Sequence, residues 1–128
     1  MPQIYAKIAP ELQRSLAPKI LALLDVELTA LVEEVFDLRG KNDVAFSAEN
    51  LVYTRGEALL QLEVRYTVGE DEYHQGEPFD PSRESKEQLA SKLKRAAEQF
   101  LERCYSGYTI PFTVSVWIQP RKESVFKM

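Results

Sequence analysis

The sequence predicts an α+β domain in which one strand–helix–strand unit occurs twice. Three observations support this prediction. Short segments with alternating apolar and polar residues lie near both ends and in the middle of the chain, and two longer segments carry apolar residues at helical spacing. These segments follow one another in the order strand, helix, strand, strand, helix, strand. Each helix is then a right-handed crossover between parallel strands, which gives a four-stranded mixed sheet with both helices on one face.

The first unit begins with a strand over residues 3–8, where apolar and polar side chains alternate. A connector that contains Pro10 and Ser15 follows it. Pro18 then fits the first turn of a helix, where its missing N–H is not needed. This helix ends in the low thirties, and its apolar stripe recurs at spacings of three and four: Leu21, Leu24, Leu28, Leu31, Val32 and Val35. Residues 43–53 complete the unit.

The second unit begins with the clearest strand of the chain, over residues 60–68. A polar loop over residues 69–82 leads to the second helix. This helix starts either at Asp80 or at a capping box made by Ser85 and Gln88. Its buried face is predicted to consist of Leu89, Leu93, Ala96, Ala97, Phe100 and Cys104.

The last strand covers residues 109–119, and its apolar side chains alternate with polar ones. One face of the predicted sheet is therefore apolar and lies under the helices. The other face carries Tyr5, Glu63, Arg65 and Trp117, which is a mixed surface that suggests partial cover by another subunit.

Composition excludes several classes of function. The chain of 128 residues is predicted to be a single domain, 1–128, with a net charge of −4, which gives no electrostatic basis for binding nucleic acid or an anionic membrane. No apolar run reaches the length of a membrane span, and the start lacks a signal peptide. Cys104 is the single cysteine, so no thiol–metal cluster forms. These features predict a soluble cytoplasmic protein with no bound metal.

Pro2 is the first candidate for catalysis. Removal of Met1, which is usual before a small residue, leaves Pro2 with a free secondary amine at the start of an ordered strand. An α-amino group has an ordinary pKa of about 7.7–8.0, and burial disfavours its charged form. A modest shift makes this amine a general base at neutral pH.

Four stretches resemble the tautomerase superfamily, which includes macrophage migration inhibitory factor and 4-oxalocrotonate tautomerase. They are Met1-Pro2, Ser15-Leu16-Ala17-Pro18, the strand around Val64, and Val114 to Arg121. Within the superfamily, the sequence is most similar to a small bacterial family of uncharacterised tautomerase-like proteins. The resemblance implies a homotrimer in which Pro2 is a general base and acid at pockets between subunits, with no cofactor.

The resemblance carries over less fully for the groups around Pro2. The last-strand positions used by the factor-like branch correspond to Ser115 and Trp117, and the arginines nearest to those of the 4-oxalocrotonate branch are out of register. Arg39 and Arg65 could hold a substrate carboxylate through paired hydrogen bonds, or form salt bridges, for Arg65 with Glu63.

Two functional hypotheses follow. The first is a tautomerase that uses Pro2 on a small keto–enol acid. The second is a non-catalytic trimeric scaffold or small-molecule-binding protein of the same fold. A third interpretation, a ferredoxin-like regulatory module, shares the order of elements but gives Pro2 no role.

Overall fold

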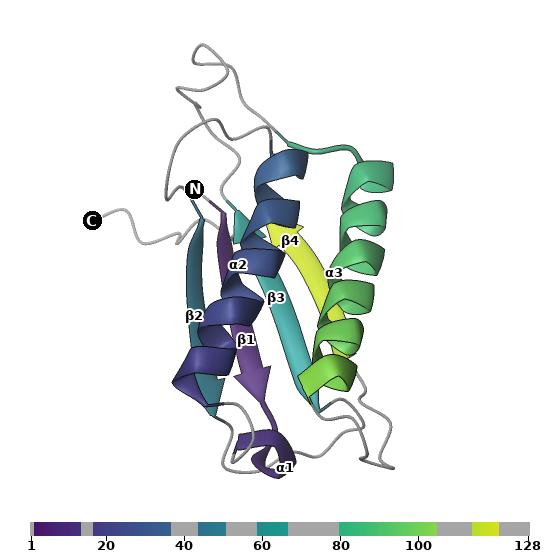
Figure 1. Cartoon of the computed structure of the whole chain (residues 1–128). Coiled ribbons are helices and arrows are strands. Elements are labelled where there is room, and N and C mark those ends of the chain that lie inside the picture. The colour runs from purple at the N-terminus through teal and green to yellow at the C-terminus, as the bar shows by residue number, and fades with distance from the viewer. Residues whose placement is uncertain are drawn as a thin grey trace, which may run out of the picture.

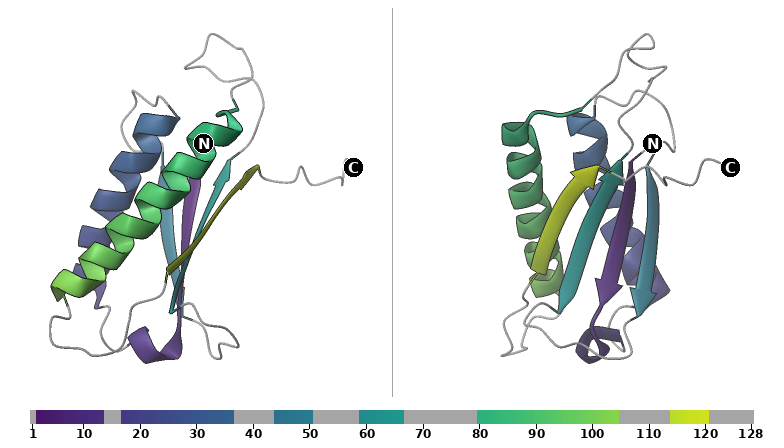
Figure 2. Two further views of the ribbon diagram at one scale, coloured as in Figure 1. Left: turned by 90° about the vertical axis from the view of Figure 1, so that its right-hand side faces the viewer. Right: turned by 180° about the vertical axis from the view of Figure 1, so that it is seen from behind.

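The computed structural model describes residues 2–13, 17–36, 44–50, 59–66, 80–104 and 114–120. These residues form the elements β1 (Gln3–Ile8), α1 (Pro10–Gln13), α2 (Pro18–Val35), β2 (Ala45–Asn50), β3 (Leu60–Tyr66), α3 (Arg83–Cys104) and β4 (Val114–Pro120). Figure 1 shows α2 and α3 side by side in front of the sheet, and the edge view in Figure 2 places both helices on the same side of it.

The sheet contains four strands in the order β2-β1-β3-β4. β1 is parallel to β2, β3 is parallel to β4, and the two halves join through the antiparallel pair β1–β3. The structure thus confirms the predicted fold: two strand–helix–strand units, a mixed sheet, and both long helices on one face.

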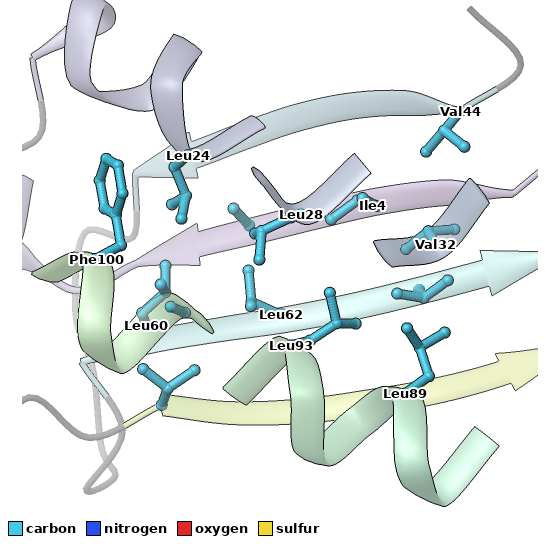
Figure 3. Packing of buried hydrophobic residues seen from close by; sticks show 14 of the residues in the cluster. Ile4, Leu24, Leu28, Val32, Val44, Leu60, Leu62, Leu89, Leu93 and Phe100 are labelled. Atoms are coloured by element: carbon cyan, nitrogen blue, oxygen red, sulfur yellow. The ribbon is translucent and has the colours of Figure 1, made fainter. Parts of the chain in front are cut away.

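The core lies between this sheet and the two long helices (Figure 3). Leu24, Leu28 and Val32 face the sheet from α2 and are fully buried, as is Leu93 of α3. Full burial of one such side chain contributes about 1.5–3 kcal/mol. On the sheet side of the core, β3 contributes every second residue, and all four are buried: Leu60, Leu62, Val64 and Tyr66.

Residues 10–13 form a helical turn, α1, where the sequence predicted only a connector. Pro10 occupies its first position, where a missing N–H costs nothing. The Leu12 amide donates to the Ala9 carbonyl at 3.0 Å, and the Leu12 side chain is 4% exposed. A single turn is too short to show a helical repeat in the sequence, so the pattern of apolar residues does not predict it.

The cap of α3 is Ser82, so both predicted starts were wrong. The Ser85 backbone N–H donates to Ser82 Oγ at 3.1 Å, and the Lys86 N–H donates to the Ser82 carbonyl at 3.0 Å. Ser85 therefore lies in the first turn and is not the cap. The helix begins at Arg83 because Ser82 satisfies an amide that the first turn leaves without a helical acceptor.

The prediction that Cys104 is a core residue was also wrong, because its side chain is exposed. The buried face of α3 continues from Phe100 to Leu101, which is fully buried, and not to the last residue of the helix. The remaining predicted members of that face lie as expected, with Ala96 only partly buried.

Replacement of a core leucine will measure this packing. We expect Leu93→Ala to lower the free energy of unfolding by about 2–5 kcal/mol, because it removes a fully buried side chain between α3 and the sheet. Its exposed neighbour provides the control: Lys94→Ala is expected to change that free energy by less than about 0.5 kcal/mol. Urea denaturation measures both. Equal losses in the two variants would contradict the described core.

Candidate active site

Pro2 lies at one end of the sheet, immediately before β1, and its side chain is buried. Its carbonyl accepts a hydrogen bond from the Ala45 N–H at 3.3 Å, which ties it to the start of β2. Continuing the strand register by one residue places Pro2 between Val44 and Tyr66, both buried. Pro2 is therefore enclosed within the sheet end by two buried neighbours.

A polar cluster stands beside this sheet end and involves the last residue of β3. The Tyr66 hydroxyl donates to Asp80 Oδ1 at 2.5 Å and accepts from Lys86 Nζ, which lies 3.1 Å away. Lys86 Nζ also lies 3.4 Å from Asp80 Oδ1. The Tyr66 ring contacts Phe36 edge-on, with 5.0 Å between ring centres. These contacts join the end of β3 to the first turn of α3.

The protonation states of this cluster follow from its contacts. Burial raises the pKa of the Tyr66 phenol, and its hydrogen bond to Asp80 raises it further. The hydrogen bond to Tyr66 raises the pKa of the Lys86 ammonium. At neutral pH the phenol is therefore a neutral hydrogen-bond donor and Lys86 carries its charge.

The other face of the sheet carries a second network, centred on Glu63. Arg65 donates to both carboxylate oxygens of Glu63, from Nε at 2.8 Å and from Nη2 at 3.1 Å. Gln119 Nε2 donates to Glu63 Oε1 at 2.6 Å. The Arg65 guanidinium also lies over the Tyr5 ring, 4.9 Å from its centre, and the Tyr5 hydroxyl donates to Gln3. The salt bridge that the sequence allowed for Arg65 is thus present.

The structure does not gather the predicted site residues into one cluster within a single chain. Arg65, Ser115 and Trp117 alternate with the buried side chains of their strands, so they lie on the face opposite the helices, whereas Pro2 follows the register of Ile4 on the helix face. Trp117 is 52% exposed. Arg39 lies outside the described residues. The substrate-binding roles of these four residues stay predictions.

Ser115 has one unusual feature. Its Oγ is buried and has no hydrogen-bond partner among the residues that the structure describes. It stands opposite Gln61 in the register of β3 and β4.

Sequence reasoning missed the Tyr66 cluster. The alternation over residues 60–68 predicts only that Tyr66 lies on the apolar face of its strand, and Asp80 is predicted only as a possible start of the second helix. No spacing in the sequence links Tyr66, Asp80 and Lys86. Only the meeting of β3 with α3 brings them together.

Two surface hollows lie between α2 and α3, towards the sheet end opposite Pro2. One, of 580 Å³, is lined by Glu27, Ala96, Gln99, Glu102 and Arg103, and the other, of 420 Å³, by Leu23, Val26, Glu27, Phe100, Arg103 and Cys104. Arg103 Nη2 and Glu27 Oε1 are 2.7 Å apart where the hollows adjoin. Neither hollow includes Pro2.

The described part of the chain contains no group of three or more metal-ligating side chains. Among the same residues, no helix combines the length and the apolar character that crossing a membrane requires.

Comparison with solved structures identifies the fold. A fused 4-OT solved as a symmetric trimer matches with a TM-score of 0.58 and 15% identity over 93% of this chain and 85% of that chain. A macrophage migration inhibitory factor-like protein from Entamoeba histolytica matches with a TM-score of 0.51 and 11% identity, over 93% and 89%. A 5-carboxymethyl-2-hydroxymuconate isomerase from Deinococcus radiodurans R1 matches with a TM-score of 0.51 and 13% identity, over 92% and 82%.

These similarities show that the chain has the tautomerase fold, as the resemblance implied. No protein-family model matches the sequence. No curated protein matches it either.

The Glu63 network predicts a measurable dependence of stability on pH. The hydrogen bonds from Arg65 lower the pKa of Glu63 from its ordinary value of 4.5. The ionised Glu63 carboxylate therefore stabilises the folded state fully above pH 4.5. This contribution is lost as the pH falls from there through the lower pKa that Glu63 has in the folded state. We expect Glu63→Gln to be less stable than wild type at about pH 6, and the difference to shrink towards about pH 3.

The control for this measurement is Glu87→Gln. Glu87 forms an exposed pair with Arg83, so its loss is expected to change the free energy of unfolding little at any pH. Denaturant titrations across this pH range measure both variants. A constant difference between Glu63→Gln and wild type would contradict the coupling of Glu63 to Arg65.

Proposed function

We propose that this protein is a cofactor-independent tautomerase that acts on a small keto–enol acid through Pro2. The observation that carries the proposal is the position of Pro2, buried at the start of β1 in a tautomerase fold. Loss of Met1 in the cytoplasm frees its amine. Burial of Pro2 favours the neutral form of that amine over the charged form.

The amine of Pro2 carries both proton transfers of the reaction. From the keto form, the Pro2 nitrogen takes a proton from the carbon beside the carbonyl, and the electron pair of that C–H bond forms the C=C bond of the enol. The protonated nitrogen then gives its proton to the carbonyl oxygen. Ketonisation is the same sequence reversed. A positioned general base of this kind accelerates proton transfer by about 10²–10⁴-fold.

We also propose that the protein is a homotrimer assembled through the open face of the sheet. Two observations support this: one matching fused 4-OT is a symmetric trimer, and the open face presents the exposed Trp117 beside the ordered Glu63 network. Trp is enriched among the residues that anchor interfaces. In a trimer, Arg65, Ser115 and Trp117 of one subunit can complete a pocket around the Pro2 of another.

The second candidate function is a non-catalytic trimeric scaffold or small-molecule binder of the same fold. One observation favours it: Arg65, which could hold a substrate carboxylate, already makes two hydrogen bonds to Glu63. A pocket whose arginine is neutralised in this way has less to attract an anionic substrate.

The direct test of the enzyme follows ketonisation of phenylenolpyruvate by protein whose intact mass confirms loss of Met1. We expect Pro2→Ala to lower the rate by about 10²–10⁴-fold, because it replaces the secondary amine of the proline ring with the primary amine of alanine at the start of β1. The thermal unfolding midpoint of the variant serves as the folding control. Equal rates for wild type and variant, both at the uncatalysed background, would favour the scaffold or binding protein.

Light scattering tests the assembly. We expect a native mass of three times the 14.7 kDa chain mass, and we expect Trp117→Glu to shift it towards the single chain by placing a charge in the interface. Leu23→Glu is the control, since Leu23 is 61% exposed on α2, on the helical side of the molecule. Dissociation by Leu23→Glu alone would contradict the proposed interface, and a dimer would favour a ferredoxin-like arrangement.

A further inference from the structure

The Tyr66 cluster has the geometry of an occupied carboxylate site. Two donors, the Tyr66 hydroxyl and the Lys86 ammonium, converge on one carboxylate oxygen, Asp80 Oδ1, at 2.5 and 3.4 Å. One donor is neutral and the other is charged, and the Lys86–Tyr66 hydrogen bond of 3.1 Å holds them in a fixed relation. Charge-assisted hydrogen bonds of this kind are the strong ones in carboxylate recognition.

The carboxylate is the accessible member of the cluster. The Asp80 side chain is 47% exposed and that of Lys86 is 24% exposed, whereas Tyr66 is 2% exposed. The Tyr66 ring is fixed by its edge-on contact with Phe36, and Lys86 lies in the first turn of α3, which Ser82 caps. Asp80 precedes that helix. The donors are thus held by packed elements, and Asp80 can leave them without disturbing the core.

The position of the cluster connects it to Pro2. β1 and β3 pair Gln3 with Arg65, so the next pair in the antiparallel register is Pro2 with Tyr66. Directly opposed residues of an antiparallel pair have Cα atoms about 4.5–5.5 Å apart. The pairing therefore sets the backbone of Pro2 beside that of Tyr66, whose side chain carries one of the two donors.

We propose that the Tyr66 hydroxyl and the Lys86 ammonium form the carboxylate-binding subsite beside Pro2, and that Asp80 occupies this subsite in the free protein. This inference rests on the proposed function, because it supplies the substrate contact that the Arg65–Glu63 pair does not. Binding of a substrate carboxylate then exchanges one anion for another, and the apparent affinity is reduced to the fraction of time for which the donors are free of Asp80.

The test measures binding without catalysis. The probe is 3-phenylpropionate, and its neutral counterpart is 3-phenylpropionamide; their dissociation constants are measured by NMR titration against the full chain with Met1 removed. We expect Lys86→Met to weaken binding of the carboxylate by about tenfold or more, because it removes a charge-assisted hydrogen bond. Tyr66→Phe is expected to weaken it less, and the affinity for the amide is expected to stay unchanged in both variants.

Asp80→Asn is expected to change the affinity for the carboxylate in the opposite direction to Lys86→Met. Its side chain is uncharged, so we expect binding of 3-phenylpropionate to tighten by about tenfold if Asp80 holds the donors nine-tenths of the time. The matched control is Lys92→Met, an exposed lysine of the same helix, which should leave the affinity unchanged. A carboxylate affinity in Lys86→Met or Asp80→Asn equal to that of Lys92→Met would overturn the proposal. Absence of carboxylate binding in both wild type and Asp80→Asn would overturn it as well.

Failure of this inference can be told apart from failure of the proposed function. If the affinities change as expected while wild type and Pro2→Ala ketonise phenylenolpyruvate equally slowly, the subsite stands and the tautomerase proposal falls. If Pro2 catalyses the reaction and Lys86→Met keeps the wild-type KM, the tautomerase proposal stands and the subsite falls.

Discussion

The antiparallel pairing of β1 with β3 is the interaction on which the rest of the structure depends. Each strand–helix–strand unit has one helix and two parallel strands, and neither unit alone can cover both sides of its apolar layer. Pairing Gln3–Ile8 with Leu60–Tyr66 brings the two units edge to edge, so that α2 and α3 share one continuous core. The same pairing sets Pro2 beside Tyr66. One backbone interaction therefore fixes both the core and the candidate active site.

The two polar networks of the molecule lie on opposite faces of this sheet and have different consequences. Glu63, Arg65 and Gln119 are joined by hydrogen bonds on the open face, and these bonds favour the ionised form of the nearly buried Glu63 carboxylate. Tyr66, Asp80 and Lys86 lie at the sheet end on the helix side, where two of the three side chains remain accessible. We propose assembly through the face that carries the first network and binding of a small anion at the second.

The same fold supports either a catalyst or a binding protein, and the difference between them lies in a few groups around Pro2. A tautomerase needs a neutral amine and a cation that orients the substrate. Burial of Pro2 favours the neutral amine. Lys86 can supply the cation, because Arg65 is already paired with Glu63. A scaffold would keep the buried proline for packing alone. Under either proposal, the groups that distinguish a catalyst from a binding protein lie at one end of the sheet.

The sequence by itself determined the four strands, the two long helices and their arrangement. Alternation over residues 3–8 and 60–68 and helical spacing from Leu21 to Val35 are local patterns. The order of elements, together with the right-handed crossover rule, leaves few sheet topologies. Those rules do not locate single-turn elements or helix caps, so α1 and the Ser82 cap appeared only in the structure. The exposure of Cys104 and the meeting of Tyr66, Asp80 and Lys86 were decided by tertiary structure. Asp80 and Lys86 follow Tyr66 by 14 and 20 positions in the sequence. Their contacts with Tyr66, like burial at the end of α3, depend on how β3 and α3 pack, which no local pattern encodes.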